Sequence, residues 1–352
     1  MKIRTSVKVI LLVMIVLVAG VISYFVLRRI SSQFTIEETL SQIKMMTRYS
    51  YPVMYHGDIG QWDDLNVHTF TIIEELDEYR LYYCGQKDSS HENAIGVAFS
   101  SKNQPLYGWE NYVGNPILNK SDSGWDSGRS GLRMGSIIKL DNGTYYLYYS
   151  EDPDPIHGNI GEIGLAISDD GLHFVKYIGN PILSPNLVDE FHVAIPRVIK
   201  VGSQFVMYYT VSTTDAGWIP SGYGVATSID GVSWNEQGII LGLGSGWDSR
   251  YMEQCSVLQC SDGIILAYEG YNESKWCIGL AYSYNITAPF IKYENNPILE
   301  CTNVTDAFDQ YHVATPYFYR TQSYFYLLYT GGNNPDYGKA YWSVGMCLYQ
   351  IR

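Results

Sequence analysis

Residues 145–149 read Tyr-Tyr-Leu-Tyr-Tyr, and residues 163–168, a short distance further on, read Ile-Gly-Leu-Ala-Ile-Ser. This pair of segments recurs five times, at intervals of about sixty residues. The Tyr-rich members are residues 79–83, 145–149, 205–209, 264–268 and 325–329, and the glycine-led members contain Gly96, Gly164, Gly224, Gly279 and Gly345. A third landmark, Asn-Pro-Ile-Leu at 115–118, 180–183 and 296–299, returns in altered form at 238–241 and 51–54. A period of this length is typical of stacked or radial repeats.

The repeated segments predict β-strands. They are short, rich in Tyr, Val and Ile, and separated by Asp-Gly, Asn-Gly and Gly-Ser turns. Four such strands fit within one repeat, the last of them being the Asn-Pro-Ile-Leu segment. The chain is therefore expected to be all-β, with a five-bladed β-propeller over residues 50–352 in which five four-stranded sheets surround an axis.

The phase of the repeat predicts how the ring closes. The fifth repeat reaches the strand of Gly345 and then stops at Arg352, before an Asn-Pro-Ile-Leu segment. Residues 51–54 are expected to supply the missing outer strand by pairing with the last blade. This pairing would cover two strand edges that are otherwise open to aggregation.

An apolar stretch without a charged residue runs from Val9 to Leu27, with basic residues on both sides. It is long enough to cross a bilayer as a helix. It is also longer than the core of a signal peptide and lacks a small-residue cleavage site, although a cleaved signal peptide is the alternative. We therefore expect a basic tail at 1–8, a transmembrane signal anchor at 9–27 and a stalk at 28–49. The protein would cross the membrane once, with the propeller extracytoplasmic.

Composition narrows the possible partners. The net charge of −13 argues against nucleic acid, because phosphate backbones require a basic surface. Six cysteines allow up to three disulfides or buried free thiols. No cysteine–histidine spacing or calcium loop is present, so no metal and no cofactor is expected. Sequons at Asn119, Asn142, Asn272, Asn285 and Asn303 fit an extracellular glycoprotein.

The axial ends of the inner strands are predicted by counting back from each Tyr-rich segment. They start at the triplets 68–70, 133–135, 194–196, 253–255 and 314–316. His68, Arg133 and Glu253 should therefore approach the centre of the ring. Other candidates lie just before these strands or in the aromatic-acid elements; they are Trp125, Asp126, Asp189, Glu190, His192, Trp247, Asp248 and His312.

At this point the sequence resembles the five-bladed propeller glycosidases. Its Asn-Pro-Ile-Leu segments and its Ser-x-Asp-Gly turns at 168–171 and 228–231 are similar to those of arabinanases, β-xylosidases, invertases and levansucrases, with the mannoside phosphorylases as a related branch. The resemblance covers about residues 50–352. It implies a carbohydrate partner and a pair of carboxyl groups across the glycosidic bond.

The resemblance matches the catalytic residues of that group only in part. Glu253 stands where the group has its general acid. The triplets Arg133-Met134-Gly135 and Ala194-Ile195-Pro196 stand where it has two aspartates, and neither contains an acid. Asp126, Asp189 or Glu190 is then the candidate base.

Residues that recur at equivalent places in the repeats are expected to be structural, and residues that do not recur are expected to be functional. The Trp-Asp pairs and the histidines His192 and His312 recur at equivalent places, which favours a structural role, with sugar binding as the alternative. Glu253 and Arg133 are unrepeated, which favours function. Arg133 is expected to pair with Glu253 or to bind a substrate anion.

Two functions follow from these residues. The first is a membrane-anchored glycoside hydrolase-like protein that acts on extracellular carbohydrate, with Glu253 as the general acid. The second is a catalytically degenerate propeller that binds carbohydrate without cleaving it. A second carboxylate near Glu253 would favour hydrolysis, and an Arg133–Glu253 pair with no other acid nearby would favour binding alone.

Overall fold

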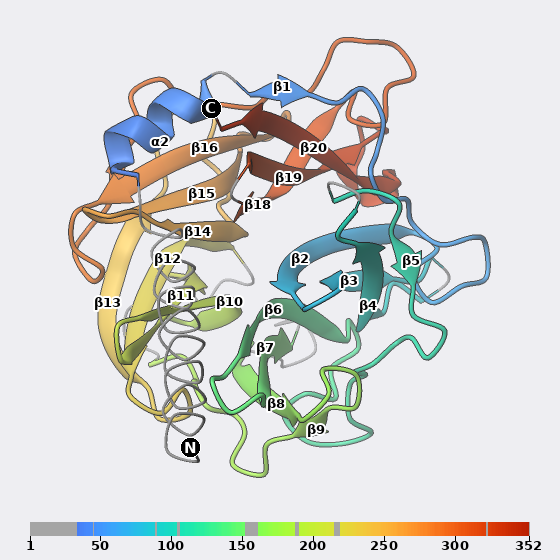
Figure 1. Cartoon of the computed structure of the whole chain (residues 1–352), viewed down its shortest axis with the longest axis vertical. Helices are drawn as coiled ribbons and strands as arrows, with labels where there is room; N and C mark the ends of the chain where they lie inside the picture. Colours follow the sequence, from blue (N-terminus) through green and yellow to red (C-terminus); the bar gives the residue numbers. More distant parts are fainter. Residues whose placement is uncertain are drawn as a thin grey trace, which may run out of the picture.

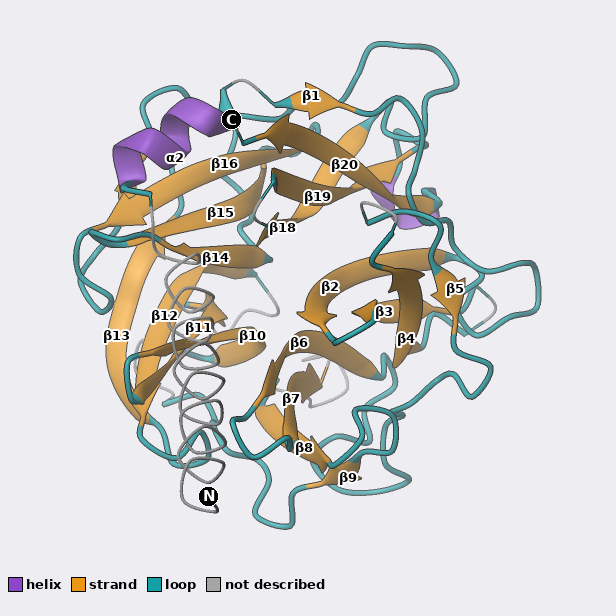
Figure 2. Ribbon diagram, viewed as in Figure 1, coloured by secondary structure: helices purple, strands orange, loops and turns teal. Residues whose placement is uncertain are grey.

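A computed structural model describes residues 34–351, apart from residues 45, 89, 104–105, 152–160, 187–189, 215–218 and 322. Within these residues the chain is almost entirely β, as predicted, and its sheets are arranged around a common centre (Figures 1 and 2). The predicted membrane anchor at 9–27 lies outside the described residues. No helix in the described part is long and apolar enough to cross a membrane.

Five repeating units of antiparallel strands, which we call blades 1 to 5, follow one another along the chain, and one parallel bridge between Asn66 and Trp342 joins blades 1 and 5 into a single sheet. Blade 1 contains β2 (Asn66–Glu74), β3 (Glu78–Gln86), β4 (Asn93–Ser101) and β5 (Glu110–Asn111). Blade 2 contains β6 (Leu132–Lys139), β7 (Tyr145–Glu151), β8 (Ile163–Ser168) and β9 (Val175–Lys176). Blade 3 contains β10 (His192–Val201), β11 (Gln204–Ser212), β12 (Pro220–Ser228) and β13 (Asn235–Gly242).

The last two blades follow the same order. Blade 4 contains β14 (Cys255–Gln259), β15 (Ile264–Tyr271), β16 (Trp276–Ser283) and β17 (Ile291–Lys292). Blade 5 contains β18 (His312–Arg320), β19 (Tyr324–Gly332) and β20 (Trp342–Gln350), with a 3-10 turn, η2 (Tyr337–Lys339), before β20. Neighbouring strands within each blade are antiparallel. Apolar clusters between successive blades, formed largely by the Tyr-rich second strands, hold the ring together.

The outer strands differ from the prediction. In blades 1, 2 and 4 the fourth strand is the short β5, β9 or β17, which precedes the Asn-Pro-Ile-Leu segment. The segment itself makes one bridge to the third strand, through Leu118, Leu183 or Leu299. Its proline has no N–H to donate to a ladder, which explains why it does not continue as a regular strand. The asparagine before the proline bonds the third strand instead, as Asn115 does with Val97.

The N-terminal segment closes the ring on blade 5. Strand β1 (Thr47–Arg48) pairs antiparallel with residues 347–348 of β20. Residues 51–54, expected to be the closing strand, contribute a single bridge between Met54 and Val344. The edge of β20 is therefore covered along two stretches (Figure 1).

The stalk assigned to residues 28–49 is corrected in its described part. Helix α2 (Ile36–Ile43) begins with a capping box formed by Thr35 and Glu38. Its residues Ile36 and Ile43 are buried in one apolar cluster with residues of blades 4 and 5. The prediction failed because eight residues carry too little periodicity to show which surface they cover. The folded unit therefore begins well before residue 50.

All six cysteines are free thiols. Five of them are buried and Cys301 is partly exposed. Burial raises the pKa of the Cys255 thiol to about 12, so this thiol is not reactive. Of the two alternatives left open by the sequence, the structure has free thiols.

Candidate functional site

A pocket of about 220 Å³ opens at the centre of the ring, where the first strands of the blades begin. His68, Arg133 and Glu253, which the repeat placed at the axis, all line it. The further lining residues come from blades 1, 4 and 5; they are Asn66, Gln86, Gln254, Glu269, Trp276, Ala314, Thr315, Thr330, Gly338 and Trp342. We call this the axial pocket.

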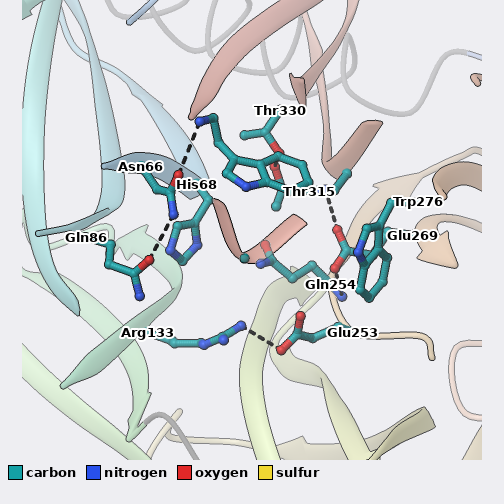
Figure 3. Close-up of a pocket in the computed structure, with 13 residues that line it drawn as sticks. Asn66, His68, Gln86, Arg133, Glu253, Gln254, Glu269, Trp276, Thr315 and Thr330 are labelled. Atoms are coloured by element: carbon teal, nitrogen blue, oxygen red, sulfur yellow. Dashed lines mark hydrogen bonds and ion pairs between the residues drawn. The ribbon is translucent and has the colours of Figure 1, made fainter. Parts of the chain in front are cut away.

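Arg133 and Glu253 form an ion pair inside the axial pocket. Arg133 Nη1 lies 2.6 Å from Glu253 Oε1, and the two side chains are 18% and 15% exposed. Arg133 comes from β6 of blade 2, and Glu253 stands two residues before β14 of blade 4. Figure 3 shows the pair reaching toward each other across the pocket. Partial burial strengthens such a pair relative to one in water and restricts both side chains.

A second carboxyl group, Glu269 of β15, lines the same pocket. It is buried, and its two oxygens accept hydrogen bonds from the backbone N–H groups of Gln254 and Thr315. Figure 3 shows it beside Trp276, on the same side of the pocket as Glu253 and opposite Asn66, His68 and Gln86. The axial pocket therefore holds two carboxyl groups.

Burial and a neighbouring charge set the protonation of the pocket. Burial raises the pKa of the Glu269 carboxyl, the negative charge of Glu253 raises it further, and the two backbone hydrogen bonds oppose the rise. Burial and the nearby Arg133 cation lower the pKa of His68 to about 3. At neutral pH the pocket thus contains a neutral histidine, an ion pair and a carboxyl group that tends to keep its proton.

The remaining walls suit a hydroxyl-rich ligand. Asn66 donates to Gln86 through a 2.8 Å hydrogen bond, and the hydroxyls of Thr315 and Thr330 lie 2.7 Å apart. Aromatic surface comes from Trp276 of β16, whose ring stacks 5.0 Å from that of Tyr271. Polar groups in fixed orientation beside aromatic faces are the usual composition of a small-ligand pocket.

Asp126 and Asp248, with Trp125 and Trp247, form part of a framework that repeats in every blade. In each blade a buried acid accepts a hydrogen bond from the tyrosine that ends the Tyr-rich segment of the second strand. The pairs are Asp63–Tyr83 (2.9 Å), Asp126–Tyr149 (3.1 Å), Glu190–Tyr209 (3.0 Å), Asp248–Tyr268 (3.0 Å) and Asp309–Tyr329 (2.7 Å). The rings of Trp125 and Trp247 stack on Tyr149 and Tyr268. None of these side chains is among those that line the axial pocket.

The structure thus corrects the role considered for Asp126. Its carboxylate also pairs with Lys176 of β9 at 2.5 Å, and Lys292 of β17 holds Asp248 in the same way. A carboxylate fully engaged with a tyrosine and a lysine inside a blade cannot reach a ligand at the axis. Asp126 and Asp248 therefore join the strands of their own blades, and the proposed base must be sought elsewhere.

Two of the three predicted histidines, His192 and His312, lie outside the pocket lining as well. His312 is buried at the start of β18, where its ring stacks on Trp342 at 5.8 Å and contacts the loop at Pro335. It supports a wall residue of the pocket. His192 is buried at the start of β10 and is not among the lining residues. Asp189 falls outside the described residues.

Glu269 was missed by the sequence argument, although the repeat contains a signal for it. The residue directly after the Tyr-rich segment is Cys84, Ser150, Thr210, Glu269 and Thr330 in the five blades. Four of these are small and uncharged, so Glu269 is as exceptional as Glu253. The same test of unrepeated acids, applied to the second strand, would have identified it.

The raised pKa of Glu269 leads to a testable dependence of stability on pH. Between the ordinary carboxyl pKa and the raised one, the folded protein holds a proton that the unfolded chain has lost. The free energy of unfolding should therefore fall as pH rises through this window, by up to about 1.4 kcal/mol per pH unit from this group. Denaturant unfolding of the wild type and Glu269→Gln across this window measures the difference.

The variant should show a flatter profile, because glutamine does not titrate. Asp230→Asn is the control, because hydrogen bonds from the backbone N–H groups of Ser233 and Val232 lower the pKa of this exposed turn carboxyl, so its removal should leave the slope in this window unchanged. Parallel pH profiles for the wild type and Glu269→Gln would contradict the assignment.

Comparisons with known proteins agree with the propeller fold. The family model described as the glycosyl hydrolases family 32 N-terminal domain matches residues 195–343 of this chain. The 1,2-beta-oligomannan phosphorylase of Thermoanaerobacter sp. is 25% identical over 132 residues, 36% of this chain and 42% of the relative. The uncharacterized protein Rv1502 of Mycobacterium tuberculosis is 25% identical over 248 residues, 66% of this chain and 77% of the relative.

Solved structures extend the likeness to most of the fold. A structure named "Glycoside hydrolase" superposes with a TM-score of 0.70 at 14% identity, covering 91% of this chain and 97% of that one. The chain resembles the propeller glycosidases. A structure from the GH130 family of mannoside phosphorylases gives a TM-score of 0.65 at 16% identity over 86% of this chain and 93% of that one. The catalytic domain of the Coprinopsis cinerea GH62 alpha-L-arabinofuranosidase gives a TM-score of 0.63 at 13% identity, covering 87% of this chain and 96% of that one. The resemblance inferred from the repeats is thereby confirmed.

Proposed function

We propose that the protein hydrolyses a glycosidic bond of a carbohydrate held in the axial pocket. The observation that carries this proposal is the presence of Glu269 in the same pocket as the Arg133–Glu253 pair. Two carboxyl groups in different protonation states are what the usual hydrolytic mechanism requires. The sequence predicted Glu253 as the general acid. We reassign this role to Glu269.

The two carboxyl groups have complementary roles. Glu269 donates its proton to the oxygen of the leaving sugar as the bond from that oxygen to the anomeric carbon breaks. Glu253 accepts a proton from the water that attacks the anomeric carbon, and Arg133 keeps its carboxylate oriented. Proton exchange with solvent then restores both groups, so the step consumes one water and leaves the protein unchanged.

The charge of the pocket favours water over inorganic phosphate as the attacking molecule. Among the described lining residues the one cation is Arg133, which is already paired with Glu253, and burial keeps His68 neutral. The carboxylate of Glu253 competes with phosphate for Arg133, and the net charge of −13 opposes the binding of a phosphate dianion. This separates the proposed reaction from that of the phosphorylases to which the chain is similar.

A glycan panel with and without phosphate tests the reaction. The panel contains β-1,2-linked oligomannan, arabinan and fructan, chosen from the similar proteins and from the resemblance to invertases. We expect free reducing sugar from at least one member, at a rate that added inorganic phosphate leaves unchanged. Sugar 1-phosphate as the product would contradict the choice of water.

A direct measurement of phosphate binding completes the test. The wild type should show no thermal stabilisation by phosphate, whereas Glu253→Gln should gain it, because its Arg133 no longer has an anionic partner. Stabilisation of the wild type by phosphate would contradict the charge argument even if no glycan were cleaved.

A carbohydrate-binding protein without catalytic activity is the second candidate. Its support is that Arg133 and Ala194–Pro196 occupy the places where the resemblance implies two aspartates. On this reading the Arg133–Glu253 pair is a fixed wall that bonds sugar hydroxyls. Binding of a panel member without release of any product would favour this candidate over hydrolysis.

The location of the activity is part of the proposal. The uncharged stretch at 9–27 would hold the protein in a membrane with the propeller outside the cytoplasm. The docked helix α2 would keep the propeller near the bilayer, because few residues separate position 27 from Ile36. Protease treatment of intact cells tests this location. Resistance of the propeller in intact cells, together with cleavage after lysis, would overturn it.

A further inference from the structure

The axis directly beneath the pocket is filled by one side chain, Arg197 of β10. It is fully buried, and its guanidinium donates to the backbone carbonyls of Phe70, Gly135 and Cys255 and to the hydroxyl of Thr71. These partners belong to the inner strands of blades 1, 2 and 4. Arg197 therefore joins four inner strands across the centre of the ring.

The contacts of Arg197 lie further along the inner strands than the residues that line the pocket. His68, Arg133, Glu253 and Ala314 line the pocket, and each is the first residue of its inner-strand triplet. The carbonyls that bind Arg197 belong to the third residues of the triplets of blades 1, 2 and 4. The guanidinium thus lies two residues deeper than the pocket lining, on the same axis.

Two further contacts close the axis around Arg197. The hydroxyl of Thr69 donates to the side-chain oxygen of Gln254 at 2.6 Å, which links blades 1 and 4 across the axis. Gly135 approaches Pro196 so closely that a Cβ there would lie 2.5 Å from the proline ring. A glycine is required where two backbones meet at this distance. The axial pocket consequently has a closed floor and opens at one end of the ring.

From this geometry we infer that the axial pocket receives the terminal sugar unit of a chain, and that the protein acts on chain ends and not on internal bonds. A polysaccharide cannot thread along an axis that Arg197 blocks. The volume of about 220 Å³ is below the roughly 300–1,000 Å³ of pockets for drug-sized ligands, so the enclosed part of the ligand is small. The reaction at that end rests on the hydrolytic function proposed above, but the closed floor does not.

The inference is tested with the same glycan panel, using each polymer and its oligosaccharides of graded length. Products are analysed from the earliest time points, and binding is followed by the fluorescence of the tryptophans, two of which line the pocket. We expect a single small product from the first time point and a slow fall in polymer size. Affinity should stop rising after the first one or two sugar units.

The outcomes separate this inference from the proposed hydrolysis. A ladder of internal fragments would overturn the chain-end assignment while supporting hydrolysis. Binding that levels off at short chain length without any cleavage would overturn hydrolysis while supporting the closed pocket. Affinity that keeps rising with chain length would overturn the closed pocket, and the absence of both binding and cleavage across the panel would overturn both.

Discussion

Replacing Glu269 with glutamine is expected to lower the rate of glycoside cleavage by about 10²–10⁴-fold, the usual contribution of a general acid. The physical reason is that burial and the charge of Glu253 keep a proton on Glu269, and glutamine cannot donate one. Substrate affinity should be nearly retained, because glutamine has the same shape and can still accept a hydrogen bond. Steady-state kinetics on the cleaved panel member, together with binding measurements, checks both parts.

The matched control is Glu190→Gln. Glu190 is as buried as Glu269 but bonds Tyr209 inside blade 3, away from the pocket lining. Both variants should lose stability, since each removes a buried acceptor of hydrogen bonds. Only Glu269→Gln should lose the catalytic rate. Equal activity of the two variants, after correction for the folded fraction, would show that Glu269 donates no proton.

Deleting residues 34–54 is expected to unfold the propeller. The deletion removes α2, β1 and the Met54 bridge, so it exposes the edge of β20 and the apolar surface under Ile36 and Ile43. Each buried aliphatic side chain contributes about 1.5–3 kcal/mol, against a total stability of about 5–15 kcal/mol. Circular dichroism and thermal unfolding would compare the deletion with a chain that begins at residue 34. A cooperative transition at the same temperature in both would contradict the prediction.

Arg48 accounts for a distinct part of this effect. Its guanidinium pairs with the framework acid Asp309 of blade 5. Lys176 and Lys292 pair in the same way with the equivalent acids of blades 2 and 4. Arg48→Ala leaves a buried carboxylate without its cation, which typically costs about 3–5 kcal/mol. Arg48→Lys keeps the charge and should retain most of the stability. Equal losses in the two variants would mean that the arginine acts through packing and not through charge.

Much of the fold is readable from the repeat. The positions of the second and third strands follow from the Tyr-rich and glycine-led segments because these residues are buried identically in each blade. The outer strands of blades 1, 2 and 4 were predicted too far along the sequence. The composition of Asn-Pro-Ile-Leu resembles that of a strand, but its proline cannot donate a hydrogen bond to a ladder. Helix α2 was missed because its burial depends on a surface that other blades build.

The candidate site was predictable only where a residue breaks the repeat. Glu253 and Arg133 are exceptions at one position of the inner strand, and both line the axial pocket. Asp126 was misjudged because an acid near an inner strand can turn inward to the axis or back into its blade. Its partner Tyr149 decides between these directions, and that contact is not visible from spacing.

The sequence by itself determined the architecture of this protein, because a repeat buried in the same way five times specifies strands, blades and their order. The tertiary structure decided the chemistry of the pocket. Glu269 stands on a second strand, yet it lines the axial pocket with Glu253, and its protonation depends on burial and on the charge of Glu253, which precedes the first strand of the same blade. Such a pKa arises from distances between residues and not from their order in the chain. The closed floor under Arg197 has the same origin, since it exists only when four inner strands converge on one guanidinium.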